Sequence, residues 1–268
     1  MAIDTPVRAE PETTPRSAVV GAPSLRAPTK MDAVRAFGTV YGPSVLLDLF
    51  VAASVAALAR RALGWRPDCA VARLFQPIAG LGVGSAVAYL AAIRPWLRRW
   101  GSTDEEVARA LPGDELVPDP AIVSTWSVKI DAPVEEVWPW LAQIGQDRGG
   151  FYSYAWLENL AGCELRNADQ VHPEWQGRTV GEVVPLHPAH GLPLAYFEPG
   201  HALVLEGWGA FVVEASDARR TRLISRTRVR TGWSAISYAL LMEIPHFVMQ
   251  RKMLLEIKER AERGDRST

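Results

Sequence analysis

Acidic and histidine side chains at close spacing are the first feature of this sequence that suggests chemistry, because Asp, Glu and His all bind metal ions. Asp169, His172 and Glu174 have such a spacing. Pro173 lies among them, and no other histidine stands at ligand spacing. We therefore expect a polar loop over the mouth of a cavity here, and we expect neither a metal ion nor a cofactor.

Candidates for nucleophilic or acid–base catalysis are few. The chain contains no G-x-S-x-G nucleophile elbow and no G-x-x-x-x-G-K phosphate loop. His187 and His190 lie in a turn rich in Pro and Gly, so we expect them at the surface. His246 follows a proline, where it faces either a cavity or a helix cap. Cys163 has only Cys69 as a companion, and we expect a free, buried thiol rather than a nucleophile.

An aromatic block, residues 138–162, is the best candidate for ligand contacts. Its pattern predicts two helices separated by a Gly-Gly turn. Ligand sites are mostly apolar with a few placed polar groups, and the block and the loop after it have this composition. The expected ligand-binding residues are Tyr152, Tyr154, Trp156, Asn159, His172 and Trp175. The alternative is that the block packs against a sheet as part of the hydrophobic core and contacts no ligand.

Strand signals surround this block. Residues 122–130 alternate in character, which is the periodicity of a strand. Further strands are predicted at 179–186, 194–197, 202–206, 210–214 and 221–231, with short turns between them. This arrangement predicts an antiparallel meander.

The last predicted strand has two different faces. Arg222, Ile224, Arg226, Arg228 and Arg230 share one face, which we expect in solvent. The other face is small and half polar, which suits a ligand cavity, so Ser225 and Thr227 join the candidate binding residues. The alternative is a core in which these hydroxyls bond to backbone groups.

Two helices should pack on the sheet. Asp131 is the expected cap of a helix opened by Pro133. Helical spacing predicts that its buried face consists of Val137, Trp140, Leu141 and Ile144. Residues 233–241 form a loop or a helical turn, and residues 246–263 a long amphipathic helix. For that helix we expect an apolar face of Val248, Leu254, Leu255, Ile257 and Ala261, with Arg260 outside.

The N-terminal part differs from the rest in charge and hydropathy. Residues 1–100 carry 12 Arg or Lys against 6 Asp or Glu, whereas residues 101–268 carry 17 against 24. Residues 1–30 are rich in proline and lack apolar periodicity, which predicts a disordered tail. Within an apolar helical region, residues 31–100, the runs 44–63 and 74–93 are candidates for membrane spans.

The end of the second apolar run favours a membrane partner. The run has about twenty uncharged residues, the length that a span needs. Arg94, Trp96, Arg98, Arg99 and Trp100 follow at once, as expected at a membrane interface. The alternative is a buried helical hairpin. No nucleic-acid motif accompanies the basic residues, so we expect no nucleic-acid partner.

Residues 101–120 separate this region from the strands. Thr103 and Glu106 have the spacing of a capping box, and the prolines that follow forbid a continued helix. We interpret 101–120 as a linker and 121–263 as the ligand-binding domain.

The order of strand, two helices, meander and long helix resembles the START/polyketide-cyclase (SRPBCC) superfamily. Ile130-Asp131-Ala132-Pro133 followed by Val137-Trp138 looks like that family's opening motif, and EIPHFVMQRKMLLEIKERAE looks like its closing helix. GGFYSYAWLENLAG, with Asn167-Ala168-Asp169 and Pro173-Glu174-Trp175, is similar to a bacterial subgroup with an N-terminal membrane segment. The resemblance covers about residues 121–263. It implies an α+β helix-grip fold, in which a curved antiparallel sheet wraps around the C-terminal helix and a deep apolar cavity lies between them.

The function that we expect is binding rather than catalysis. We expect a membrane-anchored protein that holds a hydrophobic small molecule or lipid in the cavity that the resemblance implies. Two membrane spans would place both ends of the chain, and so this domain, on the cytoplasmic side of the cell membrane. One alternative is a polyketide cyclase- or dehydratase-like enzyme that uses a Tyr or His as acid or base. The other is a non-catalytic structural membrane protein whose cavity is filled. Fold alone does not choose among them.

Overall fold

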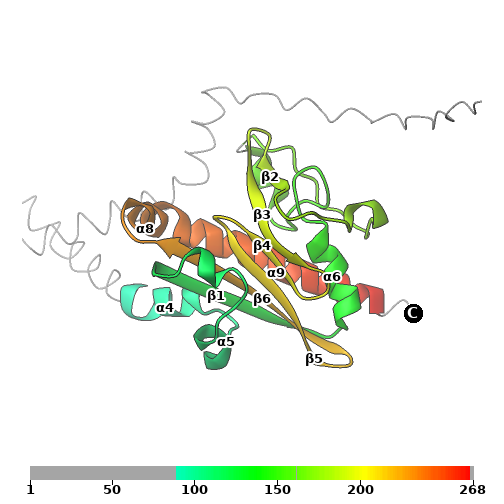
Figure 1. Ribbon diagram of the computed structural model, residues 1–268, viewed down its shortest axis with the longest axis horizontal. Helices are drawn as coiled ribbons and strands as arrows, with labels where there is room; N and C mark the ends of the chain where they lie inside the picture. Colours follow the sequence, from blue (N-terminus) through cyan, green and yellow to red (C-terminus); the bar gives the residue numbers. More distant parts are fainter. Residues whose placement is uncertain (1–88, 161, 266–268) are drawn as a thin grey trace, which may run out of the picture.

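A computed structural model of the protein describes residues 89–160 and 162–265. They form one six-stranded antiparallel sheet and a long C-terminal helix, so the expected α+β class is confirmed. The strand order is β1-β6-β5-β4-β3-β2, with the helix α9 (Glu243–Asp265) running along the sheet (Figure 1). The predicted tail and the apolar runs up to residue 88 lie outside the described residues.

The predicted meander is confirmed. After the edge strand β1 (Pro120–Ile130), the strands are β2 (Val183–His187), β3 (His190–Glu198), β4 (Ala202–Leu205), β5 (Gly209–Asp217) and β6 (Arg220–Arg230). Successive strands from β2 to β6 pair with one another, and β6 then pairs with β1. The register sets Ser124 opposite Thr227 and Trp126 opposite Ser225. These four side chains therefore share one face of the sheet.

Short helices and turns precede β1, stand between β1 and β2, and lead into α9. The π-helical turn η2 (Tyr89–Ile93), α4 (Arg94–Arg98), α5 (Asp104–Ala108) and the 3₁₀ turn η3 (Asp114–Leu116) precede β1. Between β1 and β2 stand α6 (Val134–Ala142), α7 (Ala155–Leu160) and the 3₁₀ turn η4 (Pro173–Trp175). Residues 233–241, expected to be a loop or a helical turn, form α8 (Trp233–Ser237) and most of a second π-helical turn, η5 (Tyr238–Met242), which leads into α9.

The predicted start of α6 is wrong in one detail. Pro133, not Asp131, is the N-cap residue, and no side chain caps the helix. Asp131 is exposed, and its backbone N–H donates to the carboxylate of Glu262 on α9, 2.8 Å away. The residue before α6 thus joins the strand to the C-terminal helix.

The inner face of the sheet, α6 and α9 enclose the main core. Trp126 and Ile130 of β1, Leu223 of β6, and Leu254 and Ile257 of α9 are all fully buried in it. The four apolar positions predicted for this helix are also buried, as expected, although Ile144 lies just past the end of α6. Each large apolar side chain that leaves water contributes about 1.5–3 kcal/mol, so this layer supplies much of the driving force for folding.

Two predictions for α9 are wrong. Val248 is exposed, because the stripe that faces the sheet consists of Gln250, Met253, Leu254, Ile257 and Ala261. Arg260, expected outside, is buried. Its guanidinium lies 5.1 Å from the ring centroid of Tyr152 and donates to the carbonyl of Ala168 at 3.1 Å. A charge is tolerated at this position because its hydrogen bonds are satisfied.

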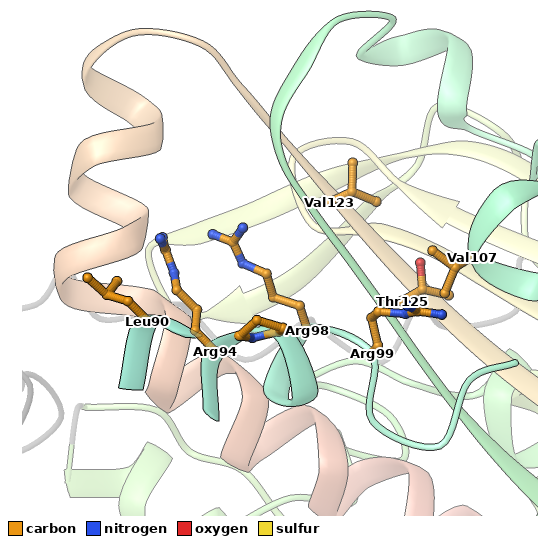
Figure 2. A pocket seen from close by; sticks show the side chains of 8 residues that line it. Leu90, Arg94, Arg98, Arg99, Val107, Val123 and Thr125 are labelled. Carbon is orange, nitrogen blue, oxygen red and sulfur yellow. The ribbon is translucent and has the colours of Figure 1, made fainter. Parts of the chain in front are cut away.

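The helix α4 is fixed to the start of α9 by ion pairs. Arg94 and Arg98 donate through Nε to the two carboxylate oxygens of Glu243, at 2.7 and 2.5 Å. Their side chains leave the same side of α4 (Figure 2). The indole N–H of Trp126 donates to the Leu97 carbonyl at 2.7 Å, which fixes α4 to β1 as well.

Residues 101–118, here named the outer strap, pack on the outer face of the sheet. Gly101 has φ +75°, and a Cβ there would lie 2.0 Å from the Ser127 carbonyl oxygen, so glycine is required. The predicted capping box of Thr103 and Glu106 is present. Leu111 of the strap packs on Val204 and other residues of this face, forming a second, smaller core.

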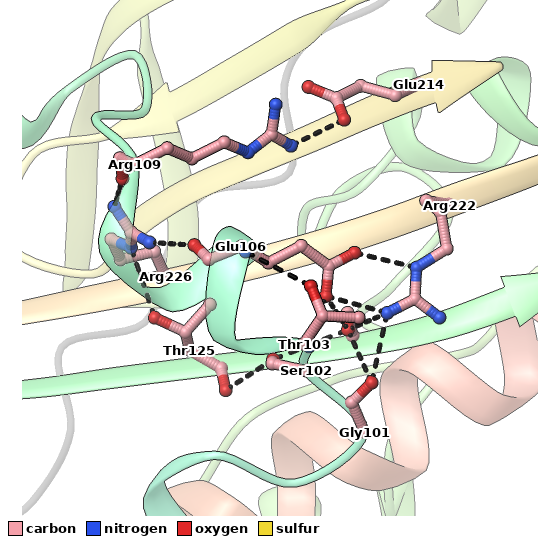
Figure 3. A network of polar contacts seen from close by, with 10 residues as sticks. Gly101, Ser102, Thr103, Glu106, Arg109, Thr125, Glu214, Arg222 and Arg226 are labelled. Carbon is pink, nitrogen blue, oxygen red and sulfur yellow. Dashed lines mark hydrogen bonds and ion pairs between the residues drawn. The ribbon is translucent and has the colours of Figure 1, made fainter. Parts of the chain in front are cut away.

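The arginine face of β6 is only partly in solvent: Arg230 is exposed, as expected, whereas the strap covers Arg222 and Arg226 (Figure 3). Arg226 is only 3% exposed. It donates to the Arg109 carbonyl at 2.7 Å and to Asp114 at 2.8 Å, and also to the backbone carbonyl of Glu106. Arg222 donates to both oxygens of the Glu106 carboxylate at 2.7 Å. Both faces of the sheet are therefore covered.

Candidate functional site

Tyr152 is a fixed part of the inner core. The side chain is fully buried, and its hydroxyl accepts from Gln143 Nε2 at 2.8 Å. Burial raises the pKa of its hydroxyl, so Tyr152 stays protonated. Its φ is +51°, a conformation rare outside glycine, and its backbone N–H donates to the Asn167 side chain at 2.8 Å. Strain of this kind persists only where the surroundings enforce it.

Three further predicted contacts lie just before α7 or within it, and they point elsewhere. Tyr154 is half-buried beneath Lys252, whose Nζ lies 5.8 Å from the ring centroid. Trp156 is 65% exposed. Asn159 closes the following loop by exchanging two hydrogen bonds with the backbone of Leu165. These three side chains do not converge on one space in the structure.

His172 and Trp175 lie together at the edge of α6. Their rings are 4.0 Å apart between centroids, and His172 Nδ1 lies 3.2 Å from Glu174. Gln143, which sequence reasoning missed, joins this loop to Tyr152: its Oε1 accepts from the backbone N–H of His172 at 3.0 Å. A single buried glutamine in an apolar helix carries no sequence signal that marks it as a hub.

Ser225 and Thr227 lie in a different group, at the start of α9. Ser225 Oγ accepts from Gln250 Nε2 at 3.0 Å. The ring of Trp208 stands between the two groups, 5.2 Å from Phe151 on one side and 6.1 Å from His246 on the other. The predicted ligand contacts are thus divided between two ends of the core.

His246 is the centre of the second group. Its Nδ1 lies 2.9 Å from the Tyr238 hydroxyl, and its ring meets Trp126 edge-on at 5.2 Å. The residue as a whole is half-buried, but its Nε2 is shielded from solvent. Burial lowers the pKa of His246 to about 4, so the imidazole is neutral near pH 7. When the Tyr238 hydroxyl donates to Nδ1, Nε2 carries the proton and is a donor.

Shielded polar atoms without a partner gather around His246. Among the described residues, six such side-chain atoms occur, and three belong here: Ser124 Oγ, Thr227 Oγ1 and His246 Nε2. A buried polar atom without a partner costs about 1–3 kcal/mol. We name this group the polar cluster; it comprises Ser124, Ser225, Thr227, Tyr238, His246 and Gln250. It offers one N–H donor and two hydroxyls, and aromatic side chains surround them.

The elements explain why the polar cluster exists. The pairing of β1 with β6 sets Ser124 and Thr227 side by side on the inner face. Tyr238 comes from η5, a π-helical turn, a form often found at functional sites. Burial raises the pKa of Tyr238, and the charge of Glu243 adds to the rise, whereas the charge of Arg98 opposes it. Sequence reasoning found Ser225 and Thr227 and left His246 open; it missed Ser124, Tyr238 and Gln250.

The pKa values of the cluster favour binding over proton transfer. An efficient general acid or base has a pKa near the working pH. His246 lies well below neutrality and Tyr238 above its ordinary value. Both groups are therefore neutral near pH 7, and the pair serves as a hydrogen-bonding unit.

Glu158 is a second buried group that sequence reasoning missed. Its carboxyl lies on the inward side of α7, and its Oε2 is shielded without a partner. Burial raises its pKa to about 7. Burial, with the charge of Glu158, raises the pKa of Cys163 to about 11. Cys163 is free, as expected, although half-buried rather than fully buried, and its raised pKa disfavours a nucleophilic role.

The remaining titratable candidates do not form a metal centre. Within residues 89–160 and 162–265, no three His, Cys, Asp or Glu side chains are grouped so as to hold an ion. Asp169 points instead toward Arg260, 3.9 Å away. His187 is half-buried and His190 exposed, with their rings 5.9 Å apart at the β2–β3 turn.

Comparisons with known proteins leave the chain without an assigned family. No family model matches it, and neither does any curated protein or solved structure. Among the described helices, none is both long and apolar enough to cross a bilayer. Functional inference therefore depends on the sequence and on the geometry of the polar cluster.

Proposed function

We propose that the protein is a membrane-anchored SRPBCC-type protein whose helix-grip domain binds an apolar small molecule or lipid between the sheet and α9. The polar cluster carries this proposal. Ligand sites combine an apolar lining with a few placed polar groups. Trp126, Trp208 and Phe211 provide the lining, and Ser124, Thr227 and His246 provide unused hydrogen-bonding capacity.

The surroundings of the cluster favour an apolar ligand. Both α4 and α8 lie at the end of the sheet far from α6 (Figure 1). The helices and turns at this end expose several large apolar side chains: Leu90, Ile93, Trp96, Trp233, Ile236 and Leu240. In the proposed arrangement, residues 44–93 enter the membrane next to this end, and the domain lies on the cytoplasmic side. An apolar ligand would then pass from lipid to the cluster over a short path.

Specific observations favour each of the two alternatives. A cyclase- or dehydratase-like enzyme is favoured by the 2.9 Å contact between Tyr238 and His246, although the pKa values of both groups oppose proton transfer near neutrality. A structural membrane protein is favoured by the aromatic side chains that fill much of the space between sheet and α9. Binding accounts for the unpartnered polar atoms, which neither alternative requires.

The proposal is tested by photo-crosslinking the full chain in lipid nanodiscs. The probe is a neutral sixteen-carbon alcohol that carries a diazirine, and labelled peptides are identified by mass spectrometry. We expect label on peptides from β1, β6 and the first turns of α9. Label confined to residues 44–93, with none on these three elements, would contradict the proposal.

A further inference from the structure

A cleft outside the core lies between α4, the outer strap and β1. Its volume is about 330 Å³. Figure 2 shows the side chains of Arg94 and Arg98 on one wall and Val123 on another. Leu90, Pro95, Arg99, Val107 and Thr125 complete the lining. None of these residues belongs to the polar cluster, so the cleft is a separate feature.

The cleft has more positive than negative charge. Arg94 and Arg98 share one carboxylate, that of Glu243, which is almost completely buried. Each arginine uses only its Nε for this contact, and among the described residues the terminal nitrogens of both have no acceptor. Two guanidinium groups against one carboxylate leave one positive charge. Arg99 adds none, because it pairs with Asp104.

The free nitrogens are placed where they can bind an anion. The side chains of Arg94 and Arg98 are only 25% and 23% exposed, so water screens them less than surface charges. Guanidinium groups present a planar fork that matches phosphate oxygens, and such charge-assisted bonds are about twice as strong as neutral ones. Nε of each group is already held by Glu243, which fixes the orientation of the fork.

The apolar wall of the cleft indicates what is attached to the anion. Leu90 is 55% exposed, and Val107 and Val123 are partly exposed. Leu90 also belongs to the end of the uncharged run 74–93. An anion bound here would therefore have apolar surface beside it, and it would lie where the chain is proposed to leave the membrane.

We propose that this cleft binds the phosphate group of an anionic amphiphile, with Arg94 and Arg98 on the phosphate and the apolar part along Leu90. The lipid source rests on the membrane placement proposed above. Basic pockets beside membrane segments are known to hold anionic lipid head groups. The site itself does not depend on the polar cluster, and a soluble phosphate ester has the same recognised group.

The experiment measures lipid retained by the full chain when it is released from nanodiscs into a native mass spectrometer. Nanodiscs contain phosphatidylcholine with about one-fifth phosphatidylglycerol, so that the membrane surface is negatively charged. We expect retention of phosphatidylglycerol over phosphatidylcholine. Arg94→Gln with Arg98→Gln should reduce that retention about tenfold, since charge-assisted hydrogen bonds are lost. The control, Arg219→Gln with Arg263→Gln, removes the same charge from exposed positions and should leave retention unchanged.

Two further variants separate binding from folding. Glu243→Gln breaks the same ion pairs but leaves both positive charges, so retention should rise. Val123→Glu adds a negative charge to the opposite wall without touching the ion pairs, so retention should fall. If Glu243→Gln lowered retention as the arginine double variant does, the arginines would be structural and the proposal would be overturned. Equal retention of both lipids by the wild type would also overturn it.

A soluble arm identifies the source of the phosphate. Glycerol 3-phosphate is added to the full chain in nanodiscs of phosphatidylcholine alone. Binding that is lost in Val123→Glu, without selective retention of phosphatidylglycerol, would assign the cleft to a soluble phosphate ester. Photo-crosslinking of the polar cluster by the neutral alcohol should be unaffected by the cleft variants, so failure of one site is distinguishable from failure of the other.

Discussion

At the scale of single residues, burial shifts the pKa values of half-buried His246 and buried Glu158 in opposite directions. The pKa of His246 is lowered to about 4, and that of Glu158 is raised to about 7. In both cases burial disfavours the charged form. The two groups therefore give stability opposite dependences on pH.

The His246 shift predicts acid sensitivity. Below about pH 6.5, the pKa of histidine in an unfolded chain, the unfolded protein binds a proton at this residue and the folded protein does not. The free energy of unfolding therefore falls as the pH is lowered from 6.5 to about 4. The free energy of unfolding should lose about 3 kcal/mol from this group across that window. Urea unfolding of wild type and His246→Gln at several pH values measures it. A difference between the two proteins that does not change between pH 7 and pH 4 would contradict the assignment.

The Glu158 shift predicts the reverse. Above pH 7 the folded protein holds an ionised, buried carboxylate, and this cost is absent below about pH 4.5, where the carboxyl is protonated in both states. Glu158→Gln should therefore raise the free energy of unfolding by about 2–3 kcal/mol at pH 8 and change it little at pH 4.5. Lower stability of the variant at pH 8 would show that the carboxylate has a partner when ionised.

At the scale of elements, several arginines of β6 hold the outer strap, and Arg226 is the most buried of them. Arg226 reaches the backbone of Glu106 and Arg109 and the carboxylate of Asp114. Arg226→Met should lower the free energy of unfolding by about 3–5 kcal/mol, because it removes the donor to the carbonyls of Glu106 and Arg109 and one of the two arginines that pair with Asp114. Arg220→Met, which removes an exposed ion pair with Asp217, should cost no more than about 1 kcal/mol. Urea unfolding midpoints distinguish the two, and equal values would contradict the role of the strap.

Much of the strand and helix pattern could be predicted from the sequence. Alternation identified β1 and β6, and helical spacing identified the buried residues of α6, because these signals are local. The packing of the outer strap on the outer face of the sheet could not be predicted. Arginine is usually exposed, so the sequence predicts that Arg226 lies in solvent. Its partners lie more than 100 positions earlier in the chain, where no local pattern indicates them.

The candidate site was predictable only in part, for the same reason. Ser225 and Thr227 stood out because small polar residues are unusual on a core face. Tyr238 and Gln250 belong to the same cluster, yet only the fold brings them to β6. Tyr152 was predicted as a ligand contact, and it is buried in the core, which was the alternative; nothing local shows that α7 turns Trp156 outward.

At the scale of the whole molecule, the features that we propose to bind ligands or face the membrane lie at one end. The polar cluster, the charged cleft and the exposed apolar side chains of α4 and α8 all lie near the start of α9. Trp233, at 84% exposed, is the most exposed large hydrophobic residue that the structure describes. The opposite end, with α6, holds the tightly bonded Gln143 and Tyr152 (Figure 1). We infer that ligands approach at the α9 end.

The central claim, that the polar cluster binds an apolar ligand, is tested most directly by Thr227→Val in the photo-crosslinking experiment. The substitution keeps the shape of the side chain and removes a hydroxyl that has no partner in the protein. The fold should therefore keep its stability, while label on β1, β6 and α9 should fall about fivefold, the value of one hydrogen bond. Thr231→Val, at an exposed position just past the strand, should be labelled as the wild type is. Undiminished labelling of Thr227→Val would contradict the account.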